Sequence, residues 1–143
     1  MPKKLLKKKV LDAWAILAFL QGEEPAASYI KNTMVEATAR KIKLFISVIN
    51  LGEIYYRIGK RKGEEKAQET LEEIRRLPIT IVPVDEESVI RAATFKINHP
   101  LSYADAFAAS LAQSRNAILV TGDLELCRLD QILSLEKLTR MSS

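Results

Sequence analysis

The sequence predicts a single α/β domain of three layers, with helices on both faces of a central, mainly parallel sheet. Short apolar runs, typical of strands covered on both faces, alternate with longer helical stretches along the whole chain. This alternation is typical of parallel β-α units. With 143 residues the chain is long enough for one continuous core, and it shows no internal repeat or linker. We therefore expect one domain over residues 1–143, with a basic N-terminal tail at 1–8.

The first elements are a strand and two helices. Lys9–Leu11 is a short strand that ends at Asp12, and Ala13–Leu20 continues as a strongly apolar helix closed by a glycine. Pro25 is well suited to the first turn of a helix, because its φ is fixed near helical values. The next helix is therefore expected from Ala26 to about Arg40.

A strand and its following helix come next. Lys43–Ile46 is the second apolar run, and Ser47 can cap a helix from Val48 to about Lys60. Apolar residues in that helix recur at a spacing of 3.6 residues and predict its core-facing side. Glu53 lies on the other side with Asn50, and periodicity does not say whether that side meets solvent or a cleft.

The middle of the chain is more polar. Glu64–Leu77 has the pattern of a charged amphipathic helix, and Ile79–Val82 is the third strand. Pro83 marks the end of this strand or indicates an edge position, because proline cannot donate a ladder hydrogen bond. A helix through Ile97 begins at Asp85 or three residues later.

The stretch from Leu101 to Glu125 contains a helix and a buried strand. Ser102 is a good N-cap, Asp105 falls in the first helical turn, and Asn116 ends the helix. Ala117–Val120 is an uninterrupted apolar run. After it we expect a turn at Thr121–Asp123, a short helix to about Leu129 and a last strand at Ile132–Leu138.

Four acidic residues are predicted at the carboxyl edge of the sheet, where ligands bind in open parallel α/β folds: Asp12, Glu53, Asp105 and Asp123. Such carboxylates repel one another and raise their pKa values, and the pattern places no lysine or arginine to neutralise them. Mg²⁺ or Mn²⁺, which prefer oxygen ligands, would relieve this repulsion. The pattern therefore favours metal-assisted phosphodiester hydrolysis.

Each acid also has an ordinary structural explanation. Asp105 can complement a helix N-terminus, Asp123 can serve in a turn, Glu53 can be solvated, and Asp12 can cap the following helix. Their coincidence at one edge favours a functional site, because a carboxylate beside an apolar strand end is costly without a partner.

The motifs around these acids, taken together, resemble the PIN domain, in particular the VapC-type toxins. The resemblance covers essentially the whole chain in order. It rests on Val10-Leu11-Asp12-Ala13, on Ser47-Val48-Ile49-Asn50-Leu51-Gly52-Glu53-Ile54-Tyr55-Tyr56, on Ser102-Tyr103-Ala104-Asp105-Ala106, and on Val120-Thr121-Gly122-Asp123-Leu124-Glu125.

The resemblance implies a Mg²⁺- or Mn²⁺-dependent endoribonuclease, the toxin of a type II VapBC toxin–antitoxin pair, with RNA as substrate, a VapB-like antitoxin as partner and a homodimeric state. It implies that Asp12 and Asp105 are direct metal ligands, that Thr121 steadies the site and that Glu125 adds a carboxylate. One departure is Ala13, where many relatives carry Ser or Thr. The family's acidic quartet is matched in full by Asp12, Glu53, Asp105 and Asp123.

Other functions remain open at this stage. A housekeeping RNA-processing nuclease and a non-catalytic binding module are possible on the same fold, although a complete acidic quartet argues against lost activity. A phosphatase or signalling domain with Asp12 as phospho-acceptor is less favoured, because Trp14 stands where a second aspartate is expected. The only histidine, His99, gives a histidine-based nuclease little to build from.

Charge and cysteine content indicate the cellular compartment of the protein and the kind of partner it binds. The net charge is +4, but five of the 22 basic residues lie among residues 3–9. The rest of the chain has 17 basic and 18 acidic residues, so the excess of positive charge is a local feature of the N-terminus. The single Cys127 excludes a disulfide framework, and no apolar run approaches the about 20 residues that span a bilayer. We therefore expect a cytoplasmic protein.

A basic cluster at Arg57 and residues 60–62 is either a solvated face or a contact for phosphates or an acidic partner.

Overall fold

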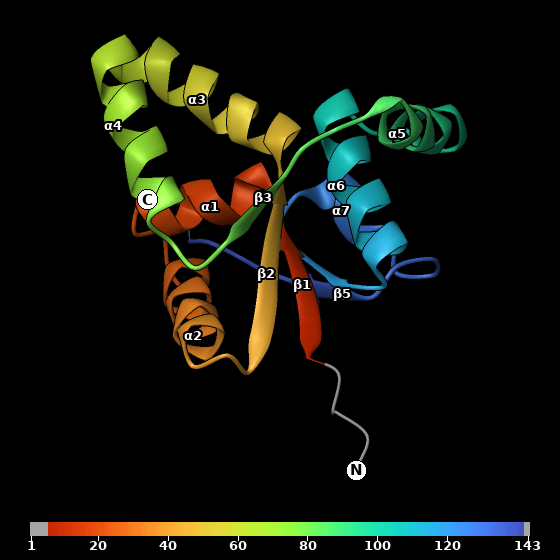
Figure 1. The fold of residues 1–143 in the computed structure, drawn as a ribbon, viewed down its shortest axis with the longest axis horizontal. Helices are drawn as coiled ribbons and strands as arrows, with labels where there is room; N and C mark the ends of the chain where they lie inside the picture. Colours follow the sequence, from red (N-terminus) through yellow and green to blue (C-terminus); the bar gives the residue numbers. More distant parts are fainter. Residues whose placement is uncertain (1–5, 142–143) are drawn as a thin grey trace.

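The computed structural model describes residues 6–141 and shows a three-layer α/β/α domain (Figure 1). The central sheet is covered by helices on both faces, as the sequence predicts. Its strands are β1 (Lys7–Leu11), β2 (Ile42–Ser47), β3 (Thr80–Val82), β4 (Ile118–Thr121) and β5 (Leu135–Lys137). The helices are α1 (Ala13–Leu20), α2 (Ala26–Thr38), α3 (Val48–Lys62), α4 (Glu64–Arg75), α5 (Glu86–Asn98), α6 (Tyr103–Arg115) and α7 (Leu124–Cys127).

All four pairs of neighbouring strands are parallel, in the order β3-β2-β1-β4-β5. The central strand β1 pairs with β2 on one side and β4 on the other, so Val10 lies opposite both Phe45 of β2 and Leu119 of β4. Strand β3 lies at one edge, in agreement with the proline that follows it. The carboxyl ends of β1 and β4 therefore lie side by side, and the residues that follow these strands meet.

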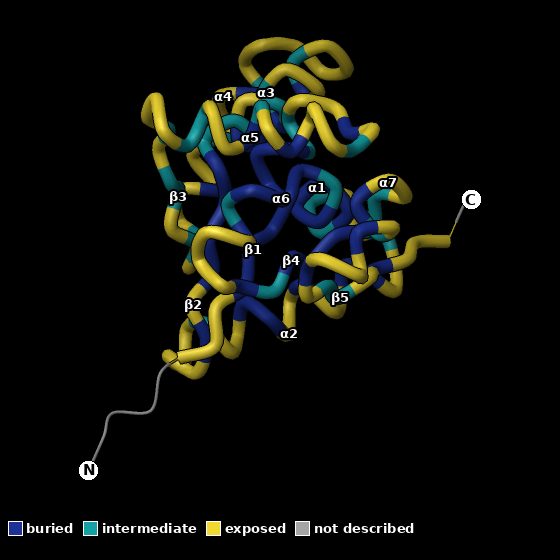
Figure 2. The backbone as a smooth tube through the Cα atoms, turned by 90° about the vertical axis from the view of Figure 1, so that its right-hand side faces the viewer, coloured by how far each residue is buried: buried dark blue, intermediate teal, exposed yellow. Residues whose placement is uncertain are grey.

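Alternating residues of each strand supply two separate cores, one on each face of the sheet. In β1, Leu11 packs in the core formed with α1 to α4, whereas Val10 packs in the core formed with α5, α6 and α7. Strand β4 repeats this pattern with Val120 and Leu119. Figure 2 shows these strands buried at the centre of the molecule. Both faces of β1 and β4 are therefore covered by packed side chains, which fixes the position of the residues that follow these strands.

Several element ends differ from the predicted ones. Strand β1 begins at Lys7, inside the range expected as tail, while Lys3 and Lys4 lie outside the described residues. The last strand is shorter than predicted, because β5 covers only Leu135–Lys137. Among the described residues, no helix is both long and apolar enough to cross a membrane.

A partly buried ion pair, in which the side chain of Lys9 is 7% and that of Glu136 26% exposed, joins β1 to β5 across β4. Lys9 is 5% exposed, and its Nζ lies 2.7 Å from Oε1 of Glu136, without hydrogen-bond geometry, and donates to Oε2 at 3.1 Å. Removing one partner of such a pair leaves the other charge buried, which costs more than the pair itself contributes.

We expect Glu136→Leu to lower the free energy of unfolding by about 3 kcal/mol, because Lys9 loses its partner. Adding Lys9→Met should recover most of this loss. Urea denaturation of both variants measures the effect, and a double variant as unstable as the single one would contradict it.

Candidate active site

Asp12 follows directly on β1 and is 1% exposed. Its Oδ1 accepts a hydrogen bond from the backbone N–H of Ala15 at 2.9 Å, so it caps α1, and its Oδ2 accepts one from the hydroxyl of Thr121. Asp12 therefore both caps α1 and lies at the end of β1, as the two explanations drawn from the sequence expect. A carboxylate buried this deeply needs such partners to offset its lost hydration.

Thr121 links the first and the last of the four acids. It is fully buried at the end of β4, and its Oγ1 donates to Asp12 while accepting from the N–H of Asp123 at 3.0 Å. Asp123 in turn accepts from the N–H of Leu126 at 3.0 Å and caps α7. Two neighbouring parallel strands therefore deliver two aspartates to one place.

Asp105 lies in the first turn of α6, half-buried. Its N–H donates to the hydroxyl of the N-cap Ser102 at 3.1 Å. The amide of Asn50 in α3 donates to the carbonyl of Ala104 at 2.9 Å, which ties α3 to the start of α6. The sequence placed Asn50 on the side of its helix that carries Glu53 and left open whether that side meets solvent; Asn50 is only 1% exposed. The side chain of Asn50 faces the backbone of α6, and the periodicity of α3 alone does not reveal such a neighbour.

Glu53 in α3 has a cation beside it, which corrects the expectation that none is placed to neutralise the acids. Oε2 of Glu53 lies 3.0 Å from the guanidinium of Arg57, one turn further along the helix. The Glu53 side chain is 12% exposed and that of Arg57 is 55% exposed. The pair follows the i, i+4 spacing that brings helix side chains together.

The pKa values show that the acids lie within electrostatic reach of one another. Burial raises the pKa of Asp12 to about 7, against the lowering effect of its hydrogen bonds to Thr121 and Ala15 and with a further contribution from the charges of Asp105 and Asp123. The pKa of Asp105 is raised to about 6 by burial and then by Asp123 and Glu53, while Arg57 opposes the shift. A second positive charge would favour the ionised forms.

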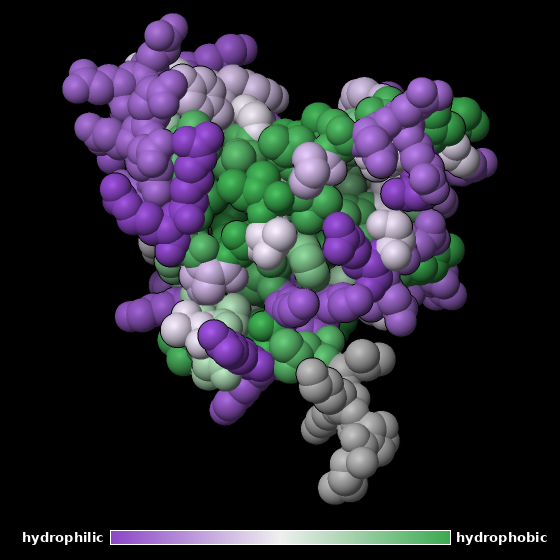
Figure 3. Space-filling model, viewed as in Figure 1, coloured by the Kyte–Doolittle hydropathy of each residue, from purple (hydrophilic) through white to green (hydrophobic). Residues whose placement is uncertain are grey.

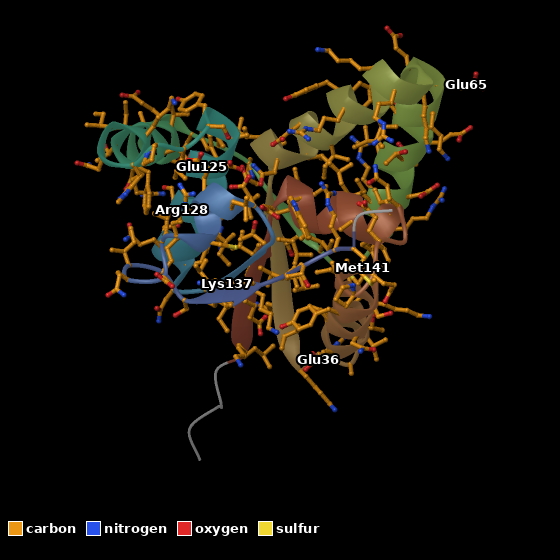
Figure 4. The ribbon with its side chains drawn as sticks, turned by 180° about the vertical axis from the view of Figure 1, so that it is seen from behind. Glu36, Glu65, Glu125, Arg128, Lys137 and Met141 are labelled. Atoms are coloured by element: carbon orange, nitrogen blue, oxygen red, sulfur yellow. The ribbon has the colours of Figure 1, made fainter. Side chains whose placement is uncertain are left out.

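Glu125, expected as a further carboxylate, lies exposed on α7 (Figure 4). It is not among the charges that shift the pKa of Asp12 or Asp105. Within residues 6–141, no three Asp, Glu, His or Cys side chains converge tightly enough to form a ready metal-binding group. Three of the four acids are instead engaged by groups of the chain: Asp12 by Thr121, Asp123 by Leu126 and Glu53 by Arg57.

The turn that carries Asp123 is packed against the indole of Trp14. A Cβ atom added at Gly122 would lie 2.4 Å from two atoms of the indole six-membered ring. The φ of Gly122 is not positive, so glycine is needed there for space. On the same ring, the guanidinium of Arg140 lies 5.0 Å from the ring centroid, within cation–π distance. The sequence offered no signal for this contact, because its three residues are far apart in the chain.

A comparison with protein families shows that the model described as the PIN domain matches residues 9–132. A search of the curated proteins finds no relative of this chain.

Solved structures with a similar fold include several toxin–antitoxin proteins. VapBC2 from Rickettsia felis, solved with a promoter DNA fragment, is similar at a TM-score of 0.70 and 23% identity, over 92% of this chain and 99% of that chain. DNA-bound VapBC from Salmonella typhimurium is similar at 0.68 and 21%, over 93% and 98%. VapC20 from Mycobacterium tuberculosis, described as a sarcin-ricin loop cleaving toxin, is similar at 0.67 and 14%, over 84% and 93%.

The raised pKa of Asp12 predicts that Asp12→Asn stabilises the metal-free protein in a pH-dependent way. The unfolded carboxyl loses its proton near pH 4 and the folded one only near pH 7, so the folded state loses stability as the pH rises between them. The amide oxygen can keep the hydrogen bond from Ala15, while the amide NH2 group would have to donate to the Thr121 hydroxyl instead of accepting from it. At about pH 8 we expect the variant to be more stable than the wild type by about 2–4 kcal/mol, since one pKa unit is worth about 1.4 kcal/mol. Urea denaturation near pH 4 and near pH 8 measures this, and an equal effect at both pH values would refute it.

The Trp14 contact predicts that Gly122→Ala lowers the free energy of unfolding by about 1–3 kcal/mol, because the added methyl group overlaps the indole. The matched control is Gly52→Ala in α3, where an added Cβ meets nothing within 4 Å. This control should be stabilised by about 0.5–1 kcal/mol, the helix preference of alanine over glycine. Equal stabilities of the two variants would show that the indole gives way freely.

Proposed function

Because this chain belongs to the PIN domain family, we propose that it is a Mg²⁺- or Mn²⁺-dependent endoribonuclease. The observation that carries the proposal is the electrostatic grouping of Asp12, Asp105 and Asp123, with Glu53 acting on Asp105, at the carboxyl edge of the sheet. The whole chain, residues 1–143, then acts as one domain built around this edge.

The chemistry of the donor set fits a hard divalent cation. Carboxylate oxygens are the preferred ligands of Mg²⁺ and Mn²⁺. Burial first, and then neighbouring carboxylates, raise the pKa values of Asp12 and Asp105, and a bound cation would favour their ionised forms. Asp12 and Asp105 would hold the ion directly, with Asp123 and Glu53 completing the set. When bound, the ion lowers the pKa of a water and stabilises charge on the phosphodiester.

The surrounding residues of the chain hold these acids in place. Thr121 orients the Asp12 carboxylate and the Asp123 backbone, and Asn50 fixes the helix start that carries Asp105. Arg57 holds Glu53 while no cation is present and restrains the pKa of Asp105. The acids are therefore oriented before any substrate binds, which lowers the cost of organising them during catalysis. Glu125, exposed on α7, is at most a contributor to the rim of the site.

We assign the protein, within this family, to the toxins of VapBC pairs. The support is the similarity of the fold to toxin–antitoxin structures over nearly their whole chains. RNA is then the substrate, a VapB-like antitoxin the inhibitor, the homodimer the working state and the cytoplasm the compartment. Light scattering of the purified protein gives its oligomeric state directly.

We expect Asp105→Asn to lower the rate of RNA cleavage in Mg²⁺ or Mn²⁺ by about 100-fold or more, since loss even of a residue that only supports a metal ligand costs 10–100-fold. EDTA should abolish cleavage by the wild type. The matched control is Asp130→Asn, which changes an exposed aspartate that pairs with Lys137 and should leave the rate unchanged. Cleavage of a mixed RNA by the purified protein is the measurement.

Cleavage that survives Asp105→Asn would place the active site elsewhere. The same variant separates the toxin from a housekeeping nuclease, because expression of the wild type alone should arrest growth and expression of Asp105→Asn should not. Cleavage without any growth arrest would favour the RNA-processing role.

A further inference from the structure

A positively charged pocket opens beside the acidic site, between α1, α3 and the C-terminal segment. Its volume is about 280 Å³, and α1 contributes Leu17 and Gln21 to its wall. Four cationic side chains line it: Arg57, Lys60 and Arg61 from α3, and Arg140 from the segment after β5. Figure 4 shows the chain near Met141 lying beside α1, on the side of the molecule where α3 and α4 project.

The positive charge of this pocket is only partly neutralised. Arg57 pairs with Glu53 at 3.0 Å, and Arg140 pairs with Glu23 at 3.0 Å. Lys60 and Arg61 form no salt bridge with a carboxylate of residues 6–141; Lys60 Nζ lies 5.7 Å from the ring centroid of Tyr56 instead. With its amide oriented to suit its neighbours, Gln21 accepts from Arg61 at 3.0 Å, a neutral contact that leaves the charge in place.

The pocket is continuous with the acidic site. Arg57 both lines the pocket and touches Glu53, and its charge acts on Asp105. Lys60 and Arg61 follow Glu53 by seven and eight residues, two helical turns, or about 10–12 Å along α3. The positive side chains therefore extend from the acids along one face of α3, the face that borders the pocket. Hydrophilic side chains cover the α3–α4 hairpin in Figure 3 as well.

We propose that this pocket binds a backbone phosphate of the RNA substrate, a short distance along the strand from the scissile bond. The inference rests on the proposed function in that it takes RNA to be the substrate. Four carboxylates repel a polyanion, so a nuclease site of this kind needs nearby cations to hold the strand. The planar guanidinium of Arg61 suits a phosphate, which it can contact through two N–H groups.

An acidic peptide is the other polyanion that such a pocket attracts. The continuity through Arg57 favours RNA, because a strand seated at the acids and running along α3 reaches Lys60 and Arg61 without a turn. The peptide becomes one outcome of the test.

The test measures binding of a short, fluorescein-labelled, single-stranded RNA of mixed sequence by anisotropy, in EDTA so that no cleavage occurs. Lys60→Ala and Arg61→Ala should each weaken binding by about 3- to 10-fold at low salt. Each should also reduce the slope of log Kd against log salt, between about 50 and 200 mM, by about 0.7, the value for one lost phosphate contact in a single strand.

The matched control is Lys62→Ala, which removes the same charge from the same helix at an exposed position outside the pocket. It should change neither Kd nor the slope. In Mg²⁺, the two pocket variants should raise KM and retain kcat, because they touch the strand away from the reacting bond.

Unchanged RNA binding in Lys60→Ala and Arg61→Ala would overturn the proposal, and so would an equal loss in Lys62→Ala, which would indicate a diffuse charge effect. Labelled polyglutamate, measured in the same way, is the probe for an acidic peptide. If Lys60→Ala and Arg61→Ala lose polyglutamate binding but keep RNA binding, the pocket belongs to an acidic protein partner and the proposal is overturned. RNA that is bound through the pocket but not cleaved in Mg²⁺ or Mn²⁺ would refute the proposed nuclease function alone, leaving the pocket assignment standing.

Discussion

The hydrogen bond between Thr121 and Asp12 joins the end of the central strand β1 to the end of its neighbour β4, and the rest of the site is arranged around it. Both residues are buried, so the bond forms where water does not compete. Through the same hydroxyl, Thr121 also fixes the backbone of Asp123. One side chain therefore links the ends of β1 and β4 to the residues that cap α1 and α7. The contacts that orient the acids also join two strands of the sheet, so a substitution at Thr121 affects both the site and the fold.

Opposite charges are separated along the molecule. The acids gather at the ends of β1 and β4 and at the starts of α6 and α3. Burial, followed by the charges of neighbouring carboxylates, raises the pKa values of Asp12 and Asp105 there. The cations stand one and two helical turns away along α3, at Arg57, Lys60 and Arg61. A uniformly anionic ligand would be attracted by the second group and repelled by the first, and a cation bound at the acids would lessen that repulsion. The layout would therefore make binding of a polyanion stronger when the acidic site is occupied.

Much of this arrangement could be predicted from the sequence, because strand ends and helix starts carry local signals. Ser102, Asp105 and Asn116 occupy the cap, first turn and left-handed end of α6, as their residue types indicate. The order of the strands and the exposure of Glu125 depend on tertiary packing, which local patterns do not contain. The surroundings of Asn50 stayed open for the same reason, since a polar side chain facing a neighbouring helix has the same periodicity as one facing water. The Glu53–Arg57 pair, in contrast, has i, i+4 spacing and was available from the sequence.

The position of Trp14 has a practical consequence. It is the only tryptophan of the chain, so all intrinsic tryptophan emission comes from a ring that touches Gly122 and lies under Arg140. Any movement of the turn that carries Asp123, or of the segment that carries Arg140, changes the surroundings of this one fluorophore. The protein therefore carries an optical reporter of its own site, and titrations with cations or nucleic acids can be followed without attaching a label.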